Sequence, residues 1–402
     1  LARNEAQHQR AEAVRARGDA EGLIEFMLTD LREKLDAVGR LDALASVSQR
    51  ALQYYGGQEL DVTDADTLGR RARTQMLIGE VDNLRGDLDR AERHMHAYHD
   101  NAQRLVALEP DRAEWRLELG YAFSNLGTLT VERRNWAKAL GWFERSRGIN
   151  EVYVAENPDD DVAILALGQD YSYAGENLAV LGRYDEAVAS LEREIRLYDR
   201  LIEAAGAHEL AEARRIWAGY FLASIDVDRG ELEAARQRLA ALDASVRKQL
   251  SLSEDDTRLR ETLVAVLRER TVVEAALGER QRALELANAA REASGLLAAM
   301  DSDNLLWQSY RAGALTTRAR LRAEGARPWP DAAAASEFEA QRERMLKLAL
   351  RAPGSTFVVL AAAEAQRLAG DLVRDGSEIA ATHWRRGRGL LPSTAAQRTP
   401  DE

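Results

Sequence analysis

A short motif that returns every 48 residues constrains the fold of this chain more than any other feature. In its clearest copy, Gly182-Arg183-Tyr184-Asp185-Glu186-Ala187, a glycine closes one helix, an aromatic residue opens the next, and a small residue follows three positions later. The small residue is an alanine at positions 91, 139, 187, 235 and 283, in strict register without insertions. A fixed period in this range predicts a stacked array of repeats, each burying its apolar face on its neighbours.

Two further columns accompany this motif. Twelve residues before each alanine the sequence has Gly79, Gly127, Gly175, Ala223 and then Thr271; four residues after it stand Met95, Phe143, Leu191, Leu239 and then Ala287. The pattern resembles the tetratricopeptide (TPR) family, in which small residues sit where two antiparallel helices cross. The usual TPR unit is about 34 residues, so the excess of about 14 residues adds roughly two turns to each helix. The resemblance implies an all-α fold, a right-handed α-solenoid of antiparallel helix pairs in a long-helix, TPR-like superhelix.

The apolar pattern divides the chain into five parts. We expect a charged helical lead-in over 1–21, with a coiled-coil stalk as the alternative, and an N-terminal capping helical hairpin over 22–57. Five repeats follow over 64–300, then a degenerate sixth repeat and C-terminal capping helices over 301–388, and a disordered tail over 389–402. In the sixth repeat we expect an irregular loop around Pro328-Trp329-Pro330. The simpler interpretation is a loop that packs back on the array, and the alternative is a functional loop.

The connectors between repeats also recur at the same spacing. Glu109-Pro110-Asp111 and Asn157-Pro158-Asp159 each end a helix, because proline cannot continue it, and each supplies an aspartate that can cap the next helix. The third repeat is thus expected to run over 160–181 and 183–204. Acidic residues at these helix starts are explained by capping and by the helix dipole more simply than by acid–base catalysis.

Composition excludes several classes of protein. The chain has no cysteine, which fits a reducing compartment and removes disulfide and thiolate chemistry. It has 55 Lys and Arg against 67 Asp and Glu, a net charge of −12, which argues against a nucleic-acid partner. No apolar run reaches the length of a membrane span and no signal peptide is visible, so we expect a cytoplasmic chain without membrane insertion.

The sequence contains no motif typical of catalysis or of cofactor binding. It lacks a phosphate-binding loop, a dinucleotide fingerprint, a His-Glu-x-x-His zinc motif and a nucleophile elbow, so we expect neither an enzyme nor a cofactor. His94, His96 and His99 form a His-x-His-x-x-His run on the first repeat. On a helix, His94 and His96 point about 160° apart, so polar surface residues are the simpler interpretation and a metal site the alternative.

Candidate binding residues follow from the TPR resemblance. In that family, residues six and three before the small position and one after it face a concave groove lined by the first helix of each unit. In this sequence these positions hold Tyr121, Ser124, Thr128, Gln169, Ser172, Glu176, Trp217, Tyr220, Ser224 and Arg268. Asn125 stands where peptide-clamping members place an asparagine that holds the ligand backbone. The alternative for Trp217 and Tyr220 is packing between repeats.

These observations favour a non-catalytic interaction module that binds a protein or peptide and senses or regulates. The segment from Glu25 to Asp42 resembles segments that precede TPR arrays in large bacterial signalling proteins, which implies an upstream effector domain. Two alternatives remain: a scaffold that self-associates and so oligomerises the upstream domain, and a solenoid that closes on a small signalling ligand. The sequence does not decide among them.

Overall fold

A computed structural model describes residues 64–84, 87–205, 208–253, 256–301, 304–323, 332–351 and 356–373, with 22, 23 and 50 in addition. Within these ranges the chain is helical and contains no strand, as the repeat pattern predicts. The expected lead-in, most of the N-terminal hairpin, the loop around Trp329 and the C-terminal tail lie outside the described residues. The chain divides into two compact units, 1–206 and 207–402.

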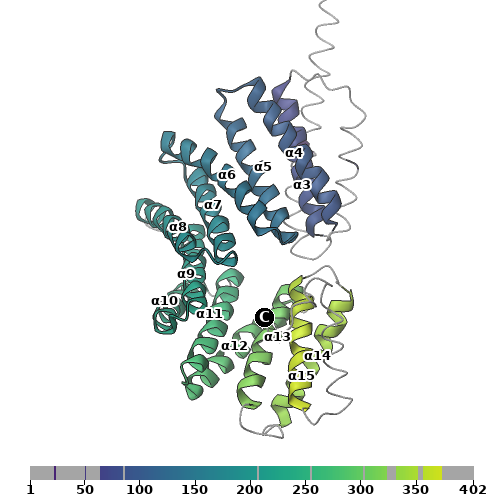
Figure 1. Cartoon of the computed structure of the whole chain (residues 1–402), viewed down its shortest axis with the longest axis vertical. Coiled ribbons are helices and arrows are strands. Elements are labelled where there is room, and N and C mark those ends of the chain that lie inside the picture. The colour runs from purple at the N-terminus through teal and green to yellow at the C-terminus, as the bar shows by residue number, and fades with distance from the viewer. Residues whose placement is uncertain are drawn as a thin grey trace, which may run out of the picture. The chain divides into compact units, whose positions relative to one another are not determined.

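The described residues of the first unit form three antiparallel helix pairs. They are α3 (Ala65–Leu84) with α4 (Leu88–Leu108), α5 (Ala113–Glu132) with α6 (Trp136–Glu156), and α7 (Asp161–Val180) with α8 (Tyr184–Ala205). Each pair packs on the next through its second helix, so that α4 contacts α5 and α6 contacts α7 (Figure 1). This is the arrangement expected of stacked helical repeats.

The second unit continues the pattern and then changes it. Its pairs are α9 (Glu209–Asp228) with α10 (Leu232–Leu250) and α11 (Thr257–Ala276) with α12 (Arg280–Met300); α13 (Leu305–Ala323), α14 (Ala332–Arg351) and α15 (Thr356–Val373) follow. Helix α13 packs on both α14 and α15, so the last three helices form one cluster. The first helices α9, α11 and α13 also contact one another in sequence.

The two residue columns of the repeat meet at the crossing of each helix pair. A Cβ atom built on Gly127 would overlap the ring of Phe143, and one built on Gly175 would lie 2.8 Å from Cγ of Leu191. The alanines of the repeated motif at 91, 139, 187, 235 and 283 are all fully buried. A larger side chain in either small column would therefore push the paired helices apart.

The turn inside each pair explains the recurring glycine. Gly182, Gly230 and Gly278 have φ values of +73°, +77° and +85°, the left-handed region that glycine enters without steric cost. The amide of Arg183 donates to the carbonyl of Leu178 at 2.9 Å, which closes the end of α7. Arg134 takes the same place in the second repeat with φ +56°, so this repeat adopts the turn with a strained residue.

One expectation about the connectors was wrong by one residue. The cap of α7 is Asp160 rather than Asp159: its carboxylate accepts a hydrogen bond from the amide of Ala163 at 3.0 Å. At the equivalent position before α5 stands Arg112, whose side chain makes no capping hydrogen bond.

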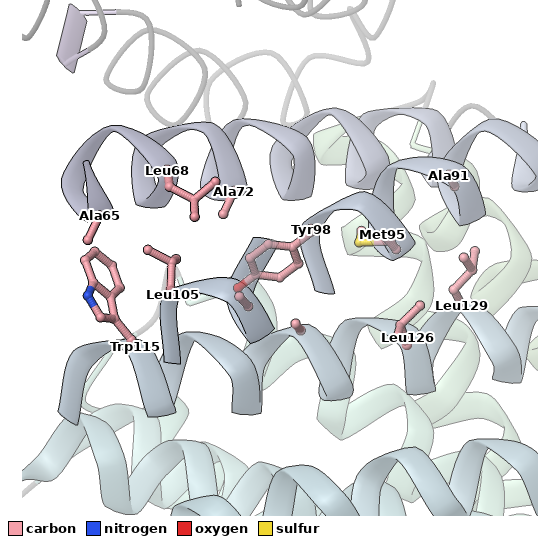
Figure 2. Packing of buried hydrophobic residues seen from close by; sticks show 12 residues of the cluster. Ala65, Leu68, Ala72, Ala91, Met95, Tyr98, Leu105, Trp115, Leu126 and Leu129 are labelled. Carbon is pink, nitrogen blue, oxygen red and sulfur yellow. The ribbon is translucent and has the colours of Figure 1, made fainter. Parts of the chain in front are cut away.

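One hydrophobic cluster of the first unit runs along the seam between α3, α4 and α5. Trp115 lies beside Ala65 and Leu105 at one end of the seam, and Tyr98 fills its middle (Figure 2). The hydroxyl of Tyr98 donates to Oε1 of Glu118 at 2.7 Å, so a buried carboxylate is satisfied inside the seam.

Among the helices that the structure describes, none is long and apolar enough to cross a membrane.

Candidate functional site

The predicted groove residues of α5 lie on a partly buried face, where several of them bond to their own helix. The amide nitrogen of Asn125 donates to the carbonyl of Tyr121 at 2.9 Å, and the hydroxyl of Thr128 donates to the carbonyl of Asn125 at 2.9 Å. Ser124 is partly buried on the same helix and its carbonyl also accepts from Thr128.

The equivalent residues of α7 include a carboxyl group with unusual protonation. Burial raises the pKa of Glu176 to about 7, against the hydrogen bond that the hydroxyl of Ser172 donates to its Oε1 at 3.4 Å. Gln169 is partly buried one turn before Ser172. At neutral pH the Glu176 carboxyl is therefore divided between its neutral and charged forms, and it can donate as well as accept a hydrogen bond.

In the second unit, aromatic and charged predicted residues lie close together. The rings of Trp217 and Tyr220 on α9 stand edge to face with centroids 5.4 Å apart, and Ser224 follows on the next turn. Burial raises the pKa of the Tyr220 hydroxyl to about 12, with the carboxylate of Glu269 adding to the effect and the guanidinium of Arg268 opposing it. Tyr220 and Arg268 therefore lie near each other, although they come from neighbouring helices.

Sequence reasoning missed the residues that extend this cluster toward α13. Burial raises the pKa of Tyr310, and both Glu261 and Arg268 act on it electrostatically. The indole nitrogen of Trp307 donates to Oε1 of Glu261 at 2.6 Å, a link between α13 and α11. Glu261 lies ten residues before the small position of its repeat, and Tyr310 lies nine residues before that of the next repeat. In the shorter TPR helix, the groove positions begin only six residues before the small position. A search that continued one helical turn further back from the small position would have found them.

We call this set of side chains the α9–α11–α13 face. It consists of two tryptophans, two tyrosines, two carboxylates, a guanidinium and a hydroxyl: Trp217, Tyr220, Ser224, Glu261, Arg268, Glu269, Trp307 and Tyr310. Flat aromatic surfaces with a few polar groups are typical of surfaces that bind peptides and proteins. The arrangement offers ring surfaces for apolar side chains and charged groups for orientation.

The three histidines of the first repeat are held by other contacts. Nδ1 of His94 lies 2.7 Å from Oε1 of Gln75, and its Nε2 faces Asp82 at 3.6 Å. The ring of His99 packs on Phe123, with centroids 5.1 Å apart, while His96 is exposed. Within the described part of the chain, no group of three histidine, aspartate or glutamate side chains could hold a metal ion.

Solved helical-repeat structures share the fold of this chain at low sequence identity. Aspartyl phosphate phosphatase F from Bacillus subtilis is 11% identical with a TM-score of 0.54, covering 99% of this chain and 92% of that one. The apo form of RapI is 9% identical with a TM-score of 0.53, covering 92% and 86%. The quorum sensor NprR from B. thuringiensis, in its apo form, is 12% identical with a TM-score of 0.52, covering 97% and 94%. No family model matches the chain, and neither does any curated protein.

These likenesses define the class of the protein. The chain has an all-α, TPR-like solenoid fold of the kind found in the helical-repeat structures named above. The identities are too low for any activity or ligand of those proteins to be carried over. Function lies in sites rather than in folds, so it must be argued from this chain's own side chains.

Proposed function

We propose that this chain is an interaction module that binds a protein or peptide and performs no chemistry of its own. The single observation that carries the proposal is the clustering of Trp217, Tyr220, Arg268 and Tyr310 on three neighbouring first helices. Tryptophan, tyrosine and arginine are the residues that contribute most to binding energy in protein interfaces.

The proposal extends to a regulatory role. One solved structure of similar fold is that of a quorum sensor, and a sensor role is part of our proposal rather than something that this likeness shows. We propose that binding on the α9–α11–α13 face controls an effector domain joined upstream, in a cytoplasmic bacterial signalling protein. The 48-residue repeat would serve as a long-helix scaffold that positions this face. Of the alternatives, self-association would bring such upstream domains together without any separate ligand.

Capture from cells of the source organism tests the proposal. The chain is cross-linked in those cells and compared with a Trp217→Ala/Tyr220→Ala variant, after circular dichroism shows that the variant keeps its helices. Trp142→Ala is the matched control, because it removes an indole from α6, outside the face. We expect one partner to be enriched by the wild type and the control and lost with the double variant.

Two outcomes would contradict the proposal. Recovery of the same partners with all three baits would show that the face does not bind them. Recovery of the chain alone, with every bait, would make self-association the function. Light scattering of the purified chain distinguishes self-association from a weak partner that was lost during purification. The average molar mass of a self-associating chain rises with protein concentration.

A further inference from the structure

Three arginines of the second unit converge on the carboxylate of Glu337. Nη1 of Arg291 on α12 lies 3.3 Å from its Oε1. From α13, Nη2 of Arg311 lies 3.7 Å from the same oxygen, and Nη1 of Arg318 lies 3.2 Å from Oε2. Glu292 also lies 3.6 Å from Arg291, but its side chain is 69% exposed, so water weakens this pair. We call Arg291, Arg311 and Arg318 the arginine socket.

The preceding repeat places opposite charges where the socket has like charges. At 48 residues before Arg291 and Arg318 stand Asp243 and Arg270, which form an ion pair between α10 and α11. The later repeat therefore keeps the arginine of the first helix and reverses the charge of its partner. Like charges at short range repel each other. The socket consequently needs an anion that its own two columns do not supply, and α14 supplies Glu337.

A glycine makes room for the third arginine of the socket. Position 295 is equivalent to Arg247, whose Nε lies 2.6 Å from Oδ1 of Asp243 in the preceding repeat. Gly295 has no such side chain, and a Cβ atom built on it would lie 3.0 Å from Nη1 of Arg311. The guanidinium of Arg311 thus lies over the backbone of α12. An alanine at 295 would displace it from the socket.

The socket has more positive charge and more donors than one carboxylate can satisfy. Nε of Arg291 is buried and has no hydrogen-bond partner among the described residues. Nε of Arg318 donates to Oδ1 of Asn288 at 2.9 Å, which fixes the direction of its guanidinium. Arg291 and Arg311 are about one third exposed, at 33% and 31%, so a small ion can reach them from solvent. Guanidinium groups match the oxygens of phosphate as paired hydrogen bonds.

We propose that the arginine socket binds phosphate, free or as a small monoester, in the place that the Glu337 carboxylate takes in this structure. The site shares no residue with the α9–α11–α13 face and is independent of the proposed function. A phosphate monoester carries a charge of about −1.5 to −2 at pH 7 and has three strong acceptor oxygens. It therefore neutralises three guanidiniums better than one carboxylate does. Its binding releases the ion pairs that join α14 to α12 and α13.

Calorimetric titration of the full chain at pH 7.5 tests this proposal, with inorganic phosphate and methyl phosphate as the two probes. Sodium chloride keeps the ionic strength constant. We expect one site per chain. Glu337→Gln removes the competing carboxylate, so it should bind phosphate roughly 10- to 100-fold more tightly than the wild type. If only inorganic phosphate binds, the ligand is the free ion; if methyl phosphate binds as tightly or more tightly, the site takes monoesters.

Arginine variants in the Glu337→Gln chain locate the site. Arg291→Met keeps the length of the side chain without its charge and should weaken phosphate binding roughly 10- to 100-fold. Arg320→Met is the matched control, because it removes the same charge from α13, where Arg320 pairs with Glu364 outside the socket. The control should bind phosphate as tightly as Glu337→Gln alone.

Thermal unfolding adds a measurement that distinguishes a binding site from a purely structural ion-pair network. Glu337→Gln should unfold at a lower temperature than the wild type, because three guanidiniums lose their shared carboxylate, and phosphate should restore the loss. Arg291→Asp in the same chain rebuilds the charge pattern of the preceding repeat. This double variant should be stable without phosphate and should not bind it.

Three results would overturn the proposal. The first is that neither the wild type nor Glu337→Gln binds either probe. The second is that Arg291→Met and Arg320→Met bind phosphate alike, which would place the anion elsewhere on the surface. The third is that phosphate stabilises Glu337→Gln no more than sodium chloride does at equal ionic strength. In that case the arginines and Glu337 only hold the three helices together.

Discussion

Asp170 offers a quantitative test of the structure, because its carboxyl group is buried where α6 and α7 pack together. Its side chain is 1% exposed, and its Oδ2 accepts a hydrogen bond from the amide of Asn150 at 2.6 Å. Burial raises its pKa from 3.8 to about 7, against the hydrogen bond from Asn150, the nearby hydroxyl of Ser146 and the charge of Arg147. The perturbation is Asp170→Asn, which keeps the shape of the side chain and removes its titration.

The magnitude follows from the difference between the two pKa values. A shift of about 3 pKa units corresponds to about 4 kcal/mol at 1.36 kcal/mol per unit. Because the pKa is raised in the folded protein, the stabilisation is fully present below pH 4 and is lost as pH rises through 7. Roughly 1.5 kcal/mol of this loss falls between pH 6 and pH 8.5, a range that avoids precipitation near the sequence isoelectric point of 5.3.

Urea denaturation of the wild type and the variant, followed by circular dichroism at pH 6 and at pH 8.5, measures this effect. The wild type should lose roughly 1.5 kcal/mol more unfolding free energy than Asp170→Asn does over this range. Asp161→Asn, at an exposed position on the same helix, is the control and should follow the wild type. Parallel pH profiles for the wild type and Asp170→Asn would show that the carboxyl is not buried as described, and the reasoning would fail.

Three further changes test the packing of the repeats by thermal or chemical unfolding. Arg134→Gly should raise the unfolding free energy by about 1 kcal/mol, because glycine adopts the left-handed backbone without strain. Gly182→Ala should lower the unfolding free energy by about as much. Equal stability of both variants and the wild type would count against backbone strain at these turns. Gly127→Ala should cost roughly 1–3 kcal/mol, because its methyl group meets the ring of Phe143, and an unchanged midpoint would contradict that close approach. Tyr98→Phe should cost about 1–3 kcal/mol, because it leaves the buried carboxylate of Glu118 without its hydroxyl donor; a neutral effect would mean that the bond does not exist in solution.

The helices were predictable from the sequence because small and large residues recur at fixed positions in each repeat, where paired helices cross. The small column and the large column meet as expected at Gly127 with Phe143 and at Gly175 with Leu191. The helix ends of the third repeat, expected at 160–181 and 183–204, lie within one residue of those found, since glycine, proline and aspartate mark them. The error at Asp160 arose because spacing alone does not tell which of three consecutive aspartates has the extended backbone of a capping residue.

The candidate site was less predictable, because the family pattern describes shorter helices. It found Trp217, Tyr220 and Arg268, but not Tyr310, which lies on α13 and more than two helical turns before the small position of its repeat. A Cβ atom built on Gly313 of α13 would lie 2.7 Å from Cζ of Arg268 on α11, a contact between helices that no local pattern encodes. Whether any of these residues binds a ligand remains a prediction.

The burial of Asp170 could have been found by comparing repeats. The residues that occupy its column at 48-residue steps are almost fully buried and, apart from Thr74, apolar: Thr74, Ala122, Ala218, Val266 and Ala314. A carboxylate in such a column is necessarily buried, and its partner Asn150 comes from the preceding helix. Single-helix periodicity hid this signal, because α7 is apolar on several sides.

Hydrogen exchange of the full chain, with and without a captured partner, tests the central claim most directly. The claim is that ligands bind on the first helices of the second unit. We predict that binding slows exchange in α9, α11 and α13, around Trp217, Arg268 and Tyr310, and that Trp217→Ala/Tyr220→Ala abolishes the change. Slower exchange confined to second helices such as α10 and α12, or unchanged by the double variant, would contradict the account.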